Sequence, residues 1–125
     1  MSEFHERRKV PRFKIPEAKI ILTQEAGFQG SEAITDEGMM DDCSVKGMRI
    51  QTEKAFKPGA KAQVQLLIPG KKTLQLIGHI IWTSQSPDVN LMLSVVEFSP
   101  FGEGEDQNSL TVREDLTKIA EEYLY

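Results

Sequence analysis

Residues 62–83 read AQVQLLIPGKKTLQLIGHIIWT, and this stretch predicts two antiparallel β-strands joined by a tight turn. Its first part alternates apolar side chains with glutamines, which is the period of a strand with one buried face. Pro69 and Gly70 then supply turn residues. The apolar run Thr73–Thr83 follows as the longest strand candidate, with Gly78 expected at a bulge or bend. The stretch therefore predicts a β-hairpin.

Outside this hairpin, the chain continues as short strands separated by turn residues. The other strand candidates are Ala18–Thr23, Gly38–Asp42, Met48–Thr52 and Asn90–Phe98, while Ser31–Asp36 fits either a loop or a weak strand. Several short strands with hairpin turns indicate a small antiparallel barrel or sandwich.

Near the C-terminus the apolar period changes from that of a strand to that of a helix. The residues at helical spacing are Val112, Leu116, Ile119, Ala120 and Tyr123. Thr111 and Glu114 fit a capping box at the start of this helix. We therefore predict a mainly all-β fold with one C-terminal α-helix. It divides into a flexible basic arm (1–16), a β-barrel (17–99), and a linker with the helix (100–125).

Composition points to one ordinary globular domain with an uneven charge distribution. The 125 residues are 39% hydrophobic and 27% charged, with a net charge of −4. Residues 1–14 carry a net charge of +3, and the remaining 111 residues carry −7. An acidic body with a short basic arm argues against a DNA or RNA partner bound over a broad surface. It allows a small anionic ligand held by a few arginines.

Motifs for common enzyme chemistry are absent. The single cysteine, Cys43, excludes an intrachain disulfide, and with two distant histidines it does not build a zinc site. No phosphate-binding glycine loop and no nucleophile–base pair are present. We expect no enzyme activity, catalytic residue, metal or cofactor. The chain also lacks a signal peptide and an apolar membrane span, so we expect a cytoplasmic protein without membrane insertion.

The first segment with a functional signal is the basic arm, which contains Arg7, Arg8 and Arg12. Arg8 and Arg12 are four residues apart in a segment that Pro11 biases towards extended backbone. The arginine side chain donates two parallel hydrogen bonds to phosphate and stacks on bases. Taken alone, the segment fits a solubilising basic terminus at least as well.

The second segment is Asp42-Cys43-Ser44-Val45-Lys46-Gly47. The Asp42 carboxylate suits the donor pair on the edge of guanine, and the Ser44 hydroxyl suits a phosphate or a base. We expect Gly47 to supply a positive φ angle or room for a ligand. Taken alone, the segment fits an Asp/Ser turn that joins two strands better than a ligand site.

Together, the order Arg-x-x-x-Arg followed by Asp-x-Ser-x-x-Gly in a small β-protein resembles the PilZ family of cyclic di-GMP (c-di-GMP) receptors. The stretches 47–50, 77–82 and 95–98 resemble further strands of that family. The resemblance implies a six-stranded antiparallel β-barrel with the arm folded over one face. We expect Trp82 in its core, since a strand tryptophan is more often buried than ligand-binding.

What the resemblance implies for function is bacterial second-messenger signalling through c-di-GMP. The ligand-binding residues would be Arg7, Arg8, Arg12, Asp42, Ser44 and Gly47. In that family, a basic residue at the position of Arg7 accompanies binding of two intercalated ligands. The resemblance therefore allows a site for two ligands. Bound ligand would order the arm and change the surface offered to an unidentified downstream protein, in pathways such as motility or biofilm formation.

Two other interpretations stay open. One is a PilZ-type protein-interaction adaptor that binds no nucleotide. The other is a small barrel for single-stranded nucleic acid, which the acidic body disfavours.

Overall fold

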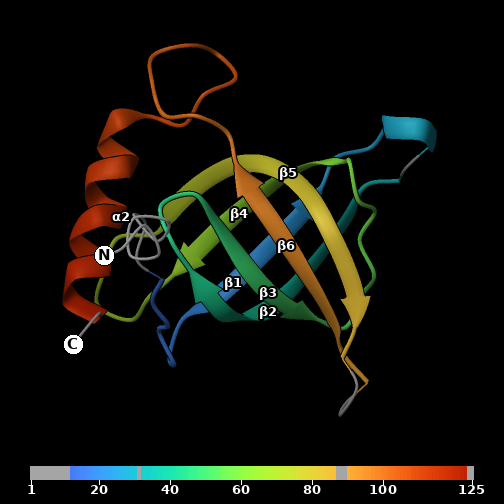
Figure 1. Cartoon of the computed structure of the whole chain (residues 1–125), viewed down its shortest axis with the longest axis horizontal. Coiled ribbons are helices and arrows are strands. Elements are labelled where there is room, and N and C mark those ends of the chain that lie inside the picture. Colours follow the sequence, from blue (N-terminus) through green and yellow to red (C-terminus); the bar gives the residue numbers. More distant parts are fainter. Residues whose placement is uncertain (1–11, 31, 87–89, 124–125) are drawn as a thin grey trace, which may run out of the picture.

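The computed structural model describes residues 12–30, 32–86 and 90–123, which form six β-strands, a short 3-10 helix and one α-helix (Figure 1). In chain order the elements are β1 (Lys19–Gln24), η1 (Phe28–Gly30), β2 (Ile34–Cys43), β3 (Gly47–Thr52), β4 (Lys61–Leu67), β5 (Leu74–Gln85), β6 (Met92–Phe98) and α2 (Leu110–Tyr123).

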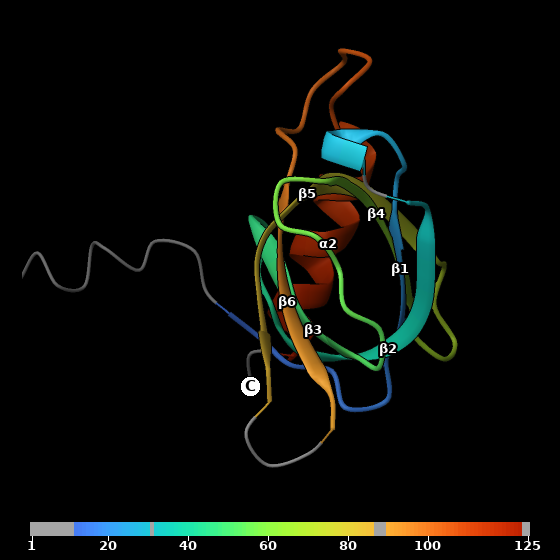
Figure 2. The ribbon, with the colours of Figure 1, turned by 90° about the vertical axis from the view of Figure 1, so that its right-hand side faces the viewer.

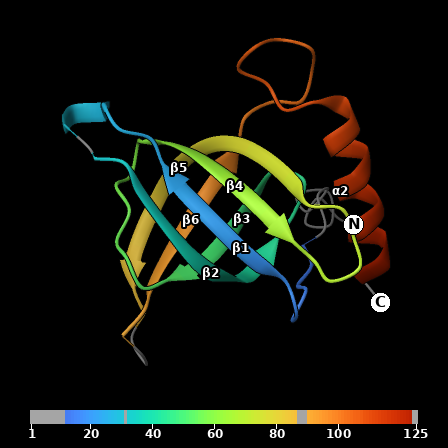
Figure 3. The ribbon, with the colours of Figure 1, turned by 180° about the vertical axis from the view of Figure 1, so that it is seen from behind.

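The strands close into an antiparallel barrel in the order β1-β2-β3-β6-β5-β4, because β1 pairs with both β2 and β4. Figure 2 looks along this barrel, with α2 across its far end, and Figure 3 shows β1 and β4 from behind. The predicted six-stranded antiparallel barrel with a C-terminal helix is confirmed.

The hairpin between β4 and β5 forms for the reasons that its sequence indicates. Val64 and Leu66 are fully buried inside the barrel, and the intervening glutamines point outward. The Lys71 amide donates to the Ile68 carbonyl at 3.0 Å, and Gly70 has a φ of 77°. Proline in the second position of a four-residue turn and glycine in the third is the pattern of a type II turn.

Two strands carry a β-bulge, which is one extra residue opposite its partner strand. In β2 the register shifts between Met40 and Asp42, so Asp41 is the extra residue. In β5 it shifts between Ile80 and Trp82. The sequence suggested a bulge or bend at Gly78, and the bulge of β5 lies a few residues further along the strand. The segment Ser31–Asp36 is resolved as strand from Ile34 onward, where it forms the first half of β2.

The linker before α2 is held to the barrel by Asn108, which is buried. Its side-chain amide donates to the carbonyls of Ile77 and Ser99, and its side-chain oxygen accepts from the Ile77 amide at 2.7 Å. The helix that follows begins two residues earlier than predicted. The Ser109 hydroxyl accepts from the Val112 amide at 3.1 Å, so Ser109 is the N-cap, and the predicted capping box is wrong.

The helix packs on the barrel through its apolar face, where Leu116, Ile119 and Ala120 are buried. Two ion pairs join α2 to the β4–β5 turn: Lys71–Glu122 at 2.7 Å and Lys72–Asp115 at 3.0 Å. These contacts fix α2 across this end of the barrel.

Candidate functional site

The arm joins the barrel immediately after Arg12. The amide of Phe13 donates to the Cys43 carbonyl and the amide of Cys43 donates to the Phe13 carbonyl, both at 2.8 Å. Phe13 and Ile15 are buried in the core. The barrel therefore starts within the segment that the sequence assigned to the arm, because two of its apolar side chains leave water.

This bridge positions Arg12 at the second motif. The Arg12 Nη2 atom lies 3.7 Å from the Asp42 Oδ1 atom, and both side chains are partly exposed. Arg7 and Arg8 lie outside the described residues. Of the arginines predicted to bind ligand, Arg12 is thus the one with a described position, and the structure brings it to the predicted carboxylate.

Ser44 closes the turn between β2 and β3. Its hydroxyl accepts from the Lys46 amide at 3.1 Å, and its own amide donates to the Gly47 carbonyl at 2.9 Å. The side chain is buried, with 4% of the residue surface exposed. These contacts are those of the Asp/Ser turn that the segment also fits, so Ser44 shapes the loop beside Asp42.

Gly47 serves the contact between β3 and β6 rather than a turn conformation. Its φ angle is not positive, so that part of the prediction is wrong. A Cβ atom at this position would lie 2.5 Å from the Val96 carbonyl oxygen. Glycine is therefore needed here because the neighbouring backbone lies too close for a side chain.

Two charged residues that the sequence prediction missed lie beside Asp42: Asp41 at the bulge of β2, and Arg49 in β3. The register pairs Arg49 directly with Asp42 across β2 and β3, and the Arg49 Nη1 atom lies 3.9 Å from the Asp41 Oδ2 atom. Arg49 alternates with buried Met48 and Ile50, a pattern that marks it as outward-facing. Two carboxylates therefore face two arginines on the outside of the barrel.

This group of four charges contains two buried atoms that lack a hydrogen bond within the described residues. They are Oδ1 of Asp42 and Nε of Arg49. The distance from Arg12 to Asp42 is that of an ion pair and exceeds a hydrogen bond. Buried polar atoms in folded proteins normally have a partner. Asp42 and Arg49 thus keep hydrogen-bonding capacity that the described residues do not use.

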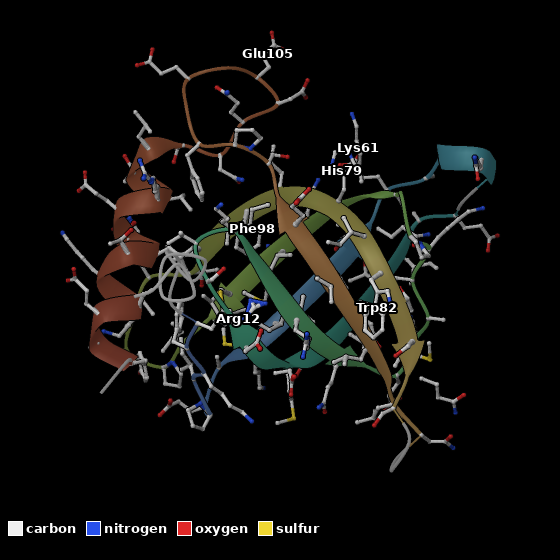
Figure 4. All side chains as sticks on the ribbon, in the orientation of Figure 1. Arg12, Lys61, His79, Trp82, Phe98 and Glu105 are labelled. Carbon is white, nitrogen blue, oxygen red and sulfur yellow. The ribbon has the colours of Figure 1, made fainter. Side chains whose placement is uncertain are left out.

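Trp82 extends this surface to β5. It pairs with Val95 of β6, which pairs with Arg49 of β3, so the three residues form one row across the wall. In Figure 4, β3 and β6 cross between Arg12 and Trp82. Trp82 is 47% exposed, so the expectation of a core tryptophan is wrong. The bulge after Ile80 is the reason, because it turns Trp82 outward.

Cys43 does not contribute a reactive group. It is fully buried, its thiol donates to the Ser44 carbonyl, and burial raises the pKa of this thiol above its ordinary value. A buried thiol with a raised pKa is a poor nucleophile. Within residues 12–30, 32–86 and 90–123, no three metal-ligating side chains of the His, Cys, Asp and Glu types gather at one point. No helix in the described part of the chain has the length and apolar character to cross a membrane.

Comparisons with known proteins agree on one family. The family model of the PilZ domain matches residues 6–112. The PilZ domain of YcgR from Escherichia coli, solved with c-di-GMP, is 18% identical with a TM-score of 0.63, over 94% of this chain and 91% of that chain. No curated protein shows a significant sequence match.

Two longer structures share the fold. MotI (DgrA), an inhibitor of motility from Bacillus subtilis, is 13% identical with a TM-score of 0.64, over 93% of this chain and 50% of that chain. MrkH from K. pneumonia, in complex with c-di-GMP, is 16% identical with a TM-score of 0.63, over 93% and 52%. The chain thus spans about half the length of MotI and MrkH. With the family model matching most of its length, the chain belongs to the PilZ domain family.

Proposed function

We propose that the chain is a c-di-GMP receptor that binds its ligand between the arginine arm and the outer face of β2 and β3. PilZ domains are receptor and adaptor domains, and the similar structures of YcgR and MrkH contain c-di-GMP. The observation that carries the proposal is the approach of Arg12 to Asp42, which joins the two sequence motifs at one point of the surface.

Each residue has a role that follows from its chemistry. Arg12 and Arg8 contact the phosphates and stack on guanine, because a guanidinium donates in a planar fork. Asp42 accepts from the adjacent N–H groups of guanine. Ser44 and Gly47 hold the loop that presents Asp42. Arg7 adds a further cation, which suits a site for two intercalated ligands.

The arm is the proposed switch. Fixing its backbone costs about 1–2 kcal/mol per residue, so the arm orders only when new contacts offset this cost. Charge-assisted hydrogen bonds to two phosphates provide such contacts. The ordered arm then changes the surface offered to a downstream protein. Motility and biofilm formation stay predictions for its pathway.

Calorimetric titration with c-di-GMP tests the proposal. We expect binding with a micromolar or lower Kd and a stoichiometry of one or two ligands per chain. The absence of heat and of any competition at millimolar c-di-GMP would overturn the receptor function while leaving the fold unaffected.

A nucleotide-free adaptor is the second candidate, and one observation favours it. Ser44 and Gly47 both have structural roles, so two motif residues are accounted for without a ligand. The same titration separates the two candidates, because an adaptor that binds no nucleotide shows no binding of c-di-GMP.

Trp82 provides an optical signal for binding because it is the only tryptophan in the chain. It lies two strands from Arg49, which is about 10 Å at ordinary strand spacing, so the two bases of one ligand have separate contact points. We expect c-di-GMP to quench the tryptophan fluorescence, and the Kd from this titration should equal the Kd from calorimetry. Trp82→Ala should weaken binding about 5- to 100-fold, the range for one lost base stack.

Ile81→Ala is the matched control, because Ile81 is the adjacent exposed apolar residue of the same bulge. It should leave the affinity within about threefold. Unchanged fluorescence at saturation, together with full affinity in Trp82→Ala, would remove Trp82 from the site.

A further inference from the structure

The bulge in β2 determines which side chains face a ligand on the outer wall. Met40 and Cys43 are buried, whereas the two residues between them, Asp41 and Asp42, are both partly exposed. A regular strand would turn one of these two inward. The bulge therefore sets two carboxylates next to each other on one face.

Arg49 lies against this pair from the neighbouring strand. Directly opposite residues of antiparallel strands have Cβ atoms about 4.5–5.5 Å apart. The Arg49 and Asp42 side chains therefore project from neighbouring positions on the same face of the sheet. The ion pair of Arg49 with Asp41 is long, at 3.9 Å, and the arginine side chain is 40% exposed. Asp41 thus holds Arg49 near Asp42 without occupying its donors fully.

The carboxylate of Asp42 and the guanidinium of Arg49 are complementary to the hydrogen-bonding edge of a nucleobase. Within the residues described, Oδ1 of Asp42 and Nε of Arg49 are buried and lack a hydrogen bond, while other parts of both side chains are exposed. Guanine presents its N1 and N2 donors next to its O6 and N7 acceptors, and bidentate arginine contact to O6 and N7 is the commonest guanine-specific contact. Building on the receptor function above, we propose that Arg49 determines base specificity: it donates to O6 and N7 of the guanine whose N1–H and N2–H groups Asp42 accepts.

The same arrangement rejects adenine. In adenine the exocyclic N6 amino group is a donor, so it meets the donors of Arg49. Adenine N1 is an acceptor, so it meets the carboxylate of Asp42. Both contacts become repulsive and leave polar groups of the wall unpaired. The pair therefore separates c-di-GMP from c-di-AMP, although both ligands carry the same charge.

The test compares the two ligands on three purified variants of the full chain. Arg49→Met keeps the length of the side chain and removes its donors. Arg49→Lys keeps the charge and removes the planar fork. Lys118→Met removes one cation from α2 and serves as the charge-matched control. Each is titrated with c-di-GMP and, by displacement, with c-di-AMP at one salt concentration, after thermal unfolding confirms a folded protein.

We expect Arg49→Met to lose about 10- to 100-fold in c-di-GMP affinity while its c-di-AMP affinity changes less than about threefold. Arg49→Lys should lose most of the discrimination, and Lys118→Met should retain it. Three results would overturn the role of Arg49 without affecting the proposal that the chain binds c-di-GMP. They are an equal loss of affinity for both ligands in Arg49→Met, full discrimination in Arg49→Lys, and a parent chain that binds both ligands alike. A parent chain that binds neither ligand would instead overturn the receptor function.

Discussion

An Arg12→Ala variant is expected to bind c-di-GMP at least about 100-fold more weakly than the parent chain, the sum of a lost charge-assisted hydrogen bond and a lost base stack. The reason is the position of Arg12. The double hydrogen bond between Phe13 and Cys43 fixes the backbone directly beside it, so its guanidinium reaches Asp42 at 3.7 Å. The backbone at Arg12 therefore needs little further ordering when a ligand binds. Most of the interaction energy between Arg12 and the ligand then appears as affinity.

Calorimetry with c-di-GMP measures this loss, and Lys14→Ala is its matched control. Lys14 is an exposed cation two residues further along the same segment, so both variants lose one positive charge. We expect Lys14→Ala to stay within about threefold of the parent. Equal losses in the two variants would indicate general attraction of the ligand to a basic arm, and would contradict a specific role for Arg12.

Stability serves as the second control for Arg12. Its ion pair with Asp42 is partly exposed, and such pairs contribute about 0–1 kcal/mol. The urea midpoint of Arg12→Ala should therefore stay close to that of the parent, so that weaker binding reports the contact and not unfolding.

Gly78→Ala is expected to destabilise the barrel by about 3 kcal/mol or more, at the upper end for an overpacked site. A Cβ atom on Gly78 would overlap the carbonyl oxygen of Glu97 and lie 3.0 Å from the Cα atom of Phe98. Both are backbone atoms of β6, so no side-chain rotation relieves the overlap. The β5–β6 pairing must open, and this pairing closes the wall that carries the site.

Urea unfolding followed by circular dichroism measures this effect, with Gly70→Ala as the comparison. Gly70 has open space around the position of a Cβ atom, and its φ of 77° carries the whole penalty, about 1–2 kcal/mol. A Gly78→Ala midpoint equal to that of Gly70→Ala or of the parent would contradict the close approach of β5 and β6.

The fold could be predicted from alternation and turn residues, as the hairpin of β4 and β5 illustrates. Alternation assumes an unbroken period of two, and both bulges break it. The bulge of β5 explains why Trp82 is exposed although strand tryptophans are more often buried, and the bulge of β2 explains why Asp41 was missed. The start of α2 was misplaced because the sequence analysis placed the cap at Thr111, whereas the hydroxyl of Ser109, two residues earlier, accepts from the Val112 amide.

The site was predicted less completely than the fold. The approach of Arg12 to Asp42 agrees with the order of the two motifs, which the family resemblance supplied. The roles of Ser44 and Gly47 in the loop and in the strand contact depend on neighbours distant in the chain, such as Val96. Single-residue patterns do not contain such neighbours, so the division between structural and ligand-binding residues needed the three-dimensional arrangement.

The bulge at Asp41 has a consequence for how this surface tolerates insertions and deletions. One residue fewer between Met40 and Cys43 restores a regular strand, in which a single residue separates two buried ones. The wall then presents one carboxylate where it now presents two, although every arginine is retained. Related chains that share both motifs are therefore expected to differ in ligand binding when the number of residues between the positions of Met40 and Cys43 differs. Residue spacing has to be compared along with residue identity.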